Sequence, residues 1–126
     1  MLHVIDTGIA RSKAPLNGTV RAGRIVYSAH ISKDPQTGAI VDGDIERQTH
    51  QALSNLRQAM QAAGGSLANV AHMQIFLTER SDSPGMNKVY AEFFSEPYPC
   101  RATVVVKELL SPGVRIELVA QAVLQD

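Results

Sequence analysis

Two charged residues in the C-terminal third have types and positions suited to chemistry. Arg101 follows a proline-marked turn at the start of a valine-rich segment. A guanidinium there presents a planar fork that fits a carboxylate through two parallel hydrogen bonds. Glu117 lies among apolar residues of a later strand-like segment, where a half-buried carboxylate can hold or activate water. The same spacing also fits a structural ion pair of Glu117 with Arg101 or Arg115, which is the commoner role of charges on strands.

The composition is that of an ordinary globular domain, with 44% hydrophobic and 19% charged residues in a chain of 126. This length supports one hydrophobic core, so we expect a single domain over residues 1–126. Twelve basic and twelve acidic residues cancel, which disfavours a nucleic-acid partner. No leader-like opening or run of ~18 apolar residues is present, so we expect no membrane partner. A single cysteine, Cys100, favours a cytoplasmic location.

The four histidines occupy separate predicted elements and share no metal-ligand spacing, so we expect no metal site. For His30 we expect a buried, hydrogen-bonded structural role. Cys100 stands beside Arg101, where a lowered thiol pKa would suit a redox sensor, but a small inert residue is the favoured interpretation.

Residue periodicity predicts the element order β-β-β-α-β-α-β-β. The expected strands cover residues 2–5, 19–31 with a tight turn at 22–24, 70–77, 101–107 and 114–124. A first helix is expected from a cap at Asp42 or Asp44 to the Gly64–Gly65 pair. A second is expected from Asp82, or the serine after it, to about Phe94.

Two helices are enough to cover only one face of a sheet with this many strands. However, Val104–Val106 and Leu118–Ala120 place apolar residues on both faces. A homo-oligomer that packs the second faces together is the economical solution, and ligand clefts would then form between subunits.

The chain resembles, over nearly its full length, the reactive-intermediate deaminase family, also called the YjgF/YER057c/UK114 family. The most specific motifs are the C-terminal ones, Pro99–Val104, Lys107–Leu109 and Arg115–Leu118. Supporting motifs are Tyr27–Ile31, where the family usually has a Ser-Gly pair, Asp34–Gly38, Gln48–Leu56 and Asn87–Phe94.

The resemblance implies an α+β fold like that of the chorismate-mutase group, with a single mixed sheet and two helices on one face. The other face is expected to be buried in a homotrimer with clefts between subunits. The implied activity is hydrolysis of enamines and imines shed by pyridoxal-phosphate enzymes, such as 2-aminoacrylate, to 2-oxo acids and ammonia. The implied substrate is a small carboxylate, and no metal or organic cofactor is expected.

The resemblance also implies roles for individual residues. Arg101 corresponds to the arginine that binds the substrate carboxylate, and Glu117 to the glutamate that positions water. Ser28 matches a pocket serine, and Asn87 and Tyr90 match a helix motif near the site.

Backbone groups between Cys100 and Thr103 are expected to complete the substrate cradle. Thr103 replaces a cysteine that often follows the arginine by two residues, and a tyrosine usual before the second strand is missing. The loop between Phe94 and Arg101 is also short. These departures leave the anchor in place and change the walls around it.

Three other functions fit the sequence less well. One is deamination of another carboxylated enamine, such as 2-aminomuconate. Another is a non-enzymatic trimer that binds a small ligand, which would keep Arg101 but need no water-activating Glu117. The weakest is a ribonuclease or translation inhibitor, because the chain has zero net charge and no interleaving of basic and aromatic residues.

Overall fold

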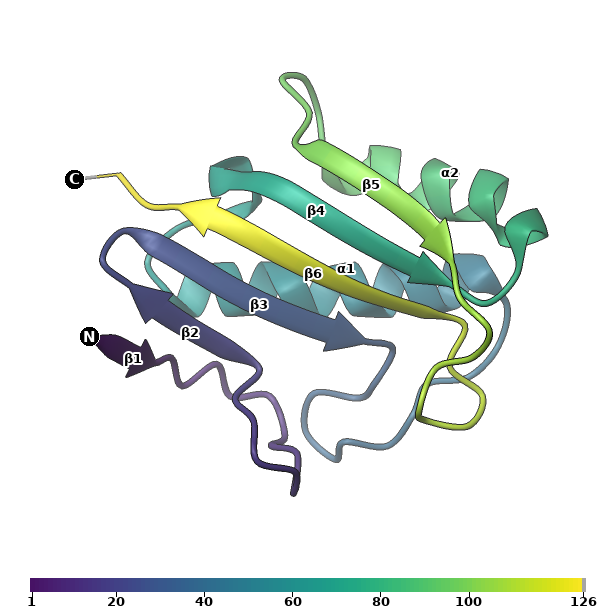
Figure 1. Cartoon of the computed structure of the whole chain (residues 1–126), viewed down its shortest axis with the longest axis horizontal. Helices are drawn as coiled ribbons and strands as arrows, with labels where there is room; N and C mark the ends of the chain where they lie inside the picture. Colours follow the sequence, from purple (N-terminus) through teal and green to yellow (C-terminus); the bar gives the residue numbers. More distant parts are fainter. Residues whose placement is uncertain (126) are drawn as a thin grey trace.

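The computed structural model describes residues 1–125, which form a six-stranded sheet with two helices behind one face (Figure 1). The strands lie side by side in the order β1-β2-β3-β6-β4-β5. The elements are β1 Leu2–Val4, β2 Thr19–Ala22, β3 Ile25–Ile31, α1 Ile45–Ala62, β4 Val70–Leu77, α2 Ser83–Phe93, β5 Cys100–Val105 and β6 Ile116–Val123. The predicted element order and the α+β class with one mixed sheet are confirmed.

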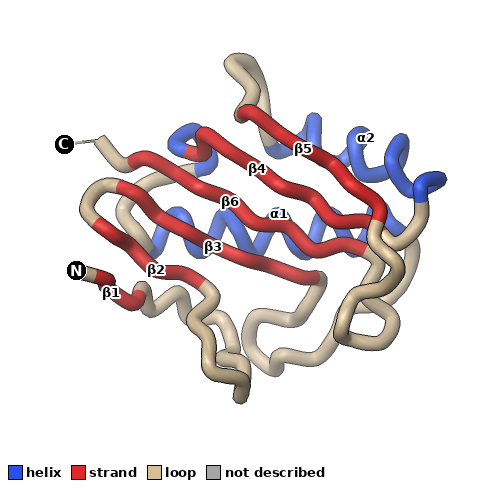
Figure 2. The backbone as a smooth tube through the Cα atoms, in the orientation of Figure 1, coloured by secondary structure: helices blue, strands red, loops and turns tan. Residues whose placement is uncertain are grey.

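Strand pairing is antiparallel throughout the sheet except between β4 and β5, which run parallel. A parallel pair needs a crossover connection, and α2 supplies it by passing behind the sheet between these two strands (Figure 2). The crossover leaves β5 at the outer edge of the sheet, with β4 as its one strand neighbour.

Local sequence signals determine where the helices begin and how closely they approach. Asp44 caps α1, because its carboxylate accepts a backbone N–H of the first turn at 2.9 Å. Gly64, just beyond α1, has a φ of +91° that favours glycine. Gly85 in α2 allows close helix packing, since a Cβ there would lie 2.7 Å from Cγ2 of Ile45. Neither helix of the described chain has the length and apolarity needed to cross a membrane.

The core lies between the helices and one face of the sheet. Alternate residues of β6 point into it and are fully or almost fully buried, namely Ile116, Leu118, Ala120 and Ala122. They pack with Leu53, Leu56 and Met60 of α1 and with Met73 and Ile75 of β4. Because side chains alternate along a strand, Glu117 and Val119 must lie on the opposite face.

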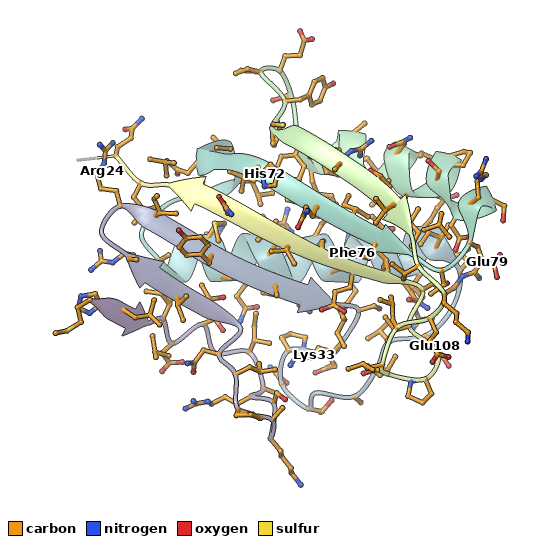
Figure 3. All side chains as sticks on the ribbon, viewed as in Figure 1. Arg24, Lys33, His72, Phe76, Glu79 and Glu108 are labelled. Atoms are coloured by element: carbon orange, nitrogen blue, oxygen red, sulfur yellow. The ribbon has the colours of Figure 1, made fainter. Side chains whose placement is uncertain are left out.

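The face away from the helices stays partly apolar and uncovered in the described chain. Phe76 and His72 of β4 lie on this face (Figure 3). Val104 and Tyr27 contribute to it with exposed fractions of 46% and 37%. The prediction that both helices cover the same face is confirmed, and the apolar residues opposite remain accessible to another chain.

A buried polar network holds the start of β6 against both helices. Arg115 donates to the two carboxylate oxygens of Asp82 at 3.0 and 2.7 Å. The backbone N–H of Arg115 donates to Gln48 of α1, whose amide donates in turn to the carbonyl of Gly113. Asp82 precedes α2 as expected, but its side chain makes no capping bond because it is engaged by Arg115.

We expect Asp82→Asn to lower the free energy of unfolding by about 2 kcal/mol, because the guanidinium of Arg115 loses its bidentate charged partner. Urea denaturation measures this change. The matched control is Glu46→Gln, which removes the exposed ion pair with Lys88 and should cost less than about 0.5 kcal/mol. Equal effects of the two substitutions would contradict the role assigned to the network.

Candidate active site

Arg101 is held in place by three side chains of the neighbouring helix. It is paired in register with Met73, a core residue, so its side chain points toward α2. Its guanidinium donates to Oδ1 of Asn87 at 2.7 Å and to Sδ of Met86 at 3.6 Å. The guanidinium carbon lies 4.5 Å from the ring centroid of Tyr90. These contacts orient the planar fork from one side.

The positive charge of Arg101 has no carboxylate partner within the described residues. Its contacts are an amide, a thioether and an aromatic face, and they use only part of its five N–H donors. The hydroxyl of Tyr90 is buried and also lacks a hydrogen-bond partner in the described structure. Burial raises the pKa of this phenol, and Arg101 opposes that effect. An oriented, uncompensated guanidinium of this kind is suited to a carboxylate ligand.

Glu117 is the negative counterpart. Partial burial raises the pKa of its carboxyl above the usual value. No hydrogen bond or ion pair to it is found across residues 1–125, since Arg115 pairs with Asp82 and Arg101 with Asn87. The alternative of a structural ion pair between Glu117 and either arginine is therefore wrong. A desolvated carboxylate without a partner is able to accept a proton from water.

The fold of a single chain keeps Arg101 and Glu117 apart. Arg101 lies on the outermost strand and points to the helix side. Glu117 lies on β6, paired with Phe76 and Ile31 on the opposite face, and β4 separates it from β5. A site that uses both residues must therefore combine surfaces of two chains.

A pocket of about 440 Å³ opens beside Glu117. Its walls are the loop between β1 and β2, the end of β3 and Glu117 itself. The loop is held to α1, because Gln58 donates to the carbonyl of Thr7 at 2.9 Å. Asn55, also in α1, donates to the carbonyl of Lys33 just beyond β3. A volume of this size falls within the roughly 300–1,000 Å³ typical of small-molecule sites.

Ser28 belongs to a buried hydrogen-bonded chain behind this pocket. Its Oγ lies 2.7 Å from Oγ1 of Thr19 and 2.6 Å from Nε2 of His30. Thr19 and His30 line the pocket, whereas Ser28 does not. The partner found for His30 agrees with the structural role expected for it, and burial lowers its pKa to about 3, helped by the charge of Lys33. The imidazole is therefore neutral at physiological pH.

The other two predicted site residues lie on β5. Cys100 and Thr103 are exposed at the edge of the sheet. Thr103 shares the face of Arg101, two residues away, while Cys100 faces the other side. No three His, Cys, Asp or Glu side chains of residues 1–125 are grouped to hold a metal ion.

Several residues around the site were not identified from the sequence. Met86 and Phe94 lie one helical turn on either side of Tyr90, and Phe94 stacks on its ring at 4.5 Å. Met86, Tyr90 and Phe94 recur every four residues, which predicts one helix face but does not indicate that this face supports Arg101. The loop before β2 was expected to form part of the wall, but the side chains that line the pocket were not predicted, because a loop without periodicity does not show which of them turn inward.

We expect wild-type stability to fall as pH is lowered from 6.5, because the unfolded His30 takes up a proton that the buried ring refuses. Between pH 6.5 and about 4.5 this loss amounts to about 2 kcal/mol relative to His30→Gln, which has no titrating group. Urea unfolding of both proteins at each pH measures it. Parallel pH dependences would show that folding leaves the pKa of His30 unchanged and would contradict its burial as a neutral ring.

The chain is similar over nearly its whole length to known proteins. The family model described as Endoribonuclease L-PSP matches residues 9–124. A human protein named 2-iminobutanoate/2-iminopropanoate deaminase is 33% identical over 98% of this chain and 93% of its own length. The 3-aminoacrylate deaminase RutC of Acinetobacter baylyi is 34% identical over 94% of each chain.

Among solved structures, E. coli TdcF with bound serine has a TM-score of 0.87 and 33% identity, covering 97% of this chain and 98% of TdcF. The family model spans nearly the whole chain, and two of the three C-terminal motifs fall largely on β5 and β6 and include Arg101 and Glu117. The chain therefore belongs to the Endoribonuclease L-PSP family, which is the reactive-intermediate deaminase or YjgF/YER057c/UK114 family.

Proposed function

We propose that this chain is a hydrolytic deaminase of reactive imines and enamines that carry a carboxylate. The observation that carries the proposal is the guanidinium of Arg101, which is oriented by Tyr90 and Asn87 and lacks an anionic partner in the described chain. A bidentate carboxylate would complete its hydrogen bonds. The deaminase names of the human and Acinetobacter relatives support the same reaction type.

The reaction replaces a C=N bond with a C=O bond. Water adds to the imine carbon, a C–O bond forms, the C–N bond breaks, and ammonia leaves together with a 2-oxo acid. Arg101 anchors the carboxylate and fixes the position of the electrophilic carbon. Glu117 takes a proton from the attacking water, and its raised pKa brings its basicity closer to that task.

We propose a homotrimer in which Arg101 of one protomer meets the Glu117 pocket of the next. The two residues lie on opposite faces of one sheet, so no single chain brings them to one substrate. The partly apolar face around Phe76 and Val104 supplies a surface for self-association. Asn87, Tyr90 and Thr103 then lie on the Arg101 side of the cleft, whereas Cys100 points to the opposite face of the sheet.

A small molecule is a better substrate than RNA, although the family model carries an endoribonuclease description. Equal numbers of basic and acidic residues give no excess of charge for binding phosphates. Arg101 is a single guanidinium beside an aromatic ring, and it does not belong to a row of basic side chains of the kind that binds nucleic acid.

We expect Arg101→Ala to fold normally and to lower kcat/KM by about 10²-fold or more, because two charge-assisted hydrogen bonds are lost. Arg101→Lys keeps the charge without the fork and should recover only part of the activity. An amino-acid oxidase generates imines in the assay, semicarbazide traps what escapes hydrolysis, and 2-oxo acid formation is measured. Wild-type rates in Arg101→Ala would refute the anchor.

Glu117→Gln should abolish turnover but leave binding of a 2-oxo acid nearly unchanged. In the wild type, activity should decline as pH falls through the raised pKa of Glu117, since the base must be ionised. Full turnover by Glu117→Gln, with ligand binding that depends on Arg101, would instead indicate that water is activated elsewhere.

A mixing experiment tests the shared site. Arg101→Ala and Glu117→Gln are unfolded together in equal amounts and refolded. Random trimers then restore about a quarter of the sites, each built from the intact residue of two neighbours. The expected activity is about a quarter of wild type, and each variant refolded alone is the control. Inactive mixtures of correctly assembled trimers would place both residues in one protomer's site.

A further inference from the structure

The pocket beside Glu117 contains positive charge that the proposed reaction does not use. Lys33 and Arg11 both line it, one just beyond β3 and the other in the loop between β1 and β2. Lys33 lies between the end of β3 and that loop (Figure 3), and its ammonium donates to the carbonyl of Ala10 at 2.8 Å. Within residues 1–125, the other two N–H donors of this ammonium have no hydrogen-bond acceptor.

Neither cation forms an ion pair within the described residues. Arg11 donates to the neutral amide of Asn17 at 3.3 Å. Two acidic residues also line the pocket. Asp6 accepts a hydrogen bond from the backbone N–H of Gly8, and burial alone raises the pKa of the Glu117 carboxyl.

His30 forms part of the same wall without adding charge. Its ring is buried, neutral and bonded to Ser28 through Nε2. The charge of Lys33 contributes to this state. The lining of the pocket therefore includes a half-buried ammonium, an exposed guanidinium and a neutral ring among mostly apolar side chains.

We propose that this pocket selects imines with an acidic side chain, so that the preferred substrates are dicarboxylates of the 2-iminosuccinate and 2-iminoglutarate class. The inference rests on the proposed function. Arg101 of one protomer binds the carboxylate next to the imine carbon, and Lys33 and Arg11 of the next bind the distal one. The distal carboxylate takes no part in the chemistry, which remains addition of water and loss of ammonia.

The volume of the pocket supports this assignment. A volume of about 440 Å³ exceeds what a three-carbon imine fills, and an apolar tail would leave Lys33 and its neighbours facing hydrocarbon. A second carboxylate occupies the space and supplies acceptors for the free N–H donors of Lys33.

The test compares two imines of equal chain length that differ in charge. Oxidation of glutamate and of norvaline by suitable amino-acid oxidases, with O₂ reduced to H₂O₂, generates 2-iminoglutarate and 2-iminopentanoate. Catalase removes the peroxide and semicarbazide competes for the imine. The wild type should show a kcat/KM about 10-fold or more higher for 2-iminoglutarate.

Lys33→Met should remove most of this preference while the rate on 2-iminopentanoate changes less than about twofold. Arg11→Gln should reduce the preference in the same direction. Lys13→Met is the matched control, because Lys13 lies in the same loop, is exposed and does not line the pocket. If Lys33→Met misfolds, the exposed Arg11 decides the outcome.

Binding separates this inference from the proposed function. Calorimetry with 2-oxoglutarate and 2-oxopentanoate should show Lys33-dependent preference for the diacid even in Glu117→Gln. Equal or faster turnover of the neutral imine would overturn the inference and leave the deaminase intact. No turnover of any imine, with selective 2-oxoglutarate binding retained, would overturn the proposed function and support the acidic-ligand pocket.

Discussion

Two helices against six strands are the constraint on which the rest of this structure depends. They cover one face of the sheet and bury alternate residues of β4 and β6, such as Met73 and Leu118. The residues between them, including Glu117, are left on a face that no described element of the chain covers. β5 lies at the edge of the sheet, so Arg101 has β4 on one side and rests its side chain on α2. Both charges therefore lie outside the chain's own core, as the proposed shared site requires.

The assignment of partners among the charged residues determines which of them remain reactive. Arg115 is two residues from Glu117, but it turns to the helix side and binds Asp82. Glu117 is thereby left unpaired and partly desolvated, and the pKa of its carboxyl rises. Arg101 is supported by an amide and an aromatic ring, which orient it without neutralising it. Structural and chemical roles are thus divided between two arginines that look alike in sequence.

The pocket beside Glu117 shows how a shared fold can be specialised. The family model spans the sheet and both helices, while the loop between β1 and β2 forms much of the pocket wall. In this chain that wall brings Lys33 and Arg11 to one pocket with His30, and it has no tyrosine. Charge in the wall acts on whatever part of a ligand lies away from the reacting carbon, so it affects selectivity more than reaction type.

Sequence alone was enough to predict the element order, the cap of α1 as one of two alternatives, and the placement of Arg101 and Glu117 on two C-terminal strands. Alternation in β4 and β6 and the 3.6-residue period of α1 are local properties, and burial of one face reinforces them. Family motifs added the expected roles of Arg101 and Glu117. Boundaries differed by one or two residues, as at β5, which begins at Cys100 and ends at Val105.

Tertiary structure decided the partners of each polar group. Periodicity assigns a side chain to a face but not to a neighbour, so the pairing of Arg115 with Asp82 was not predicted. Likewise, the burial of Ser28 behind Thr19 and His30 depends on the pairing of β2 with β3. The separation of Arg101 from Glu117 follows from the strand order, because the α2 crossover places β5 beyond β4. These are contacts between distant segments, whose energies depend on distances that only the folded chain defines.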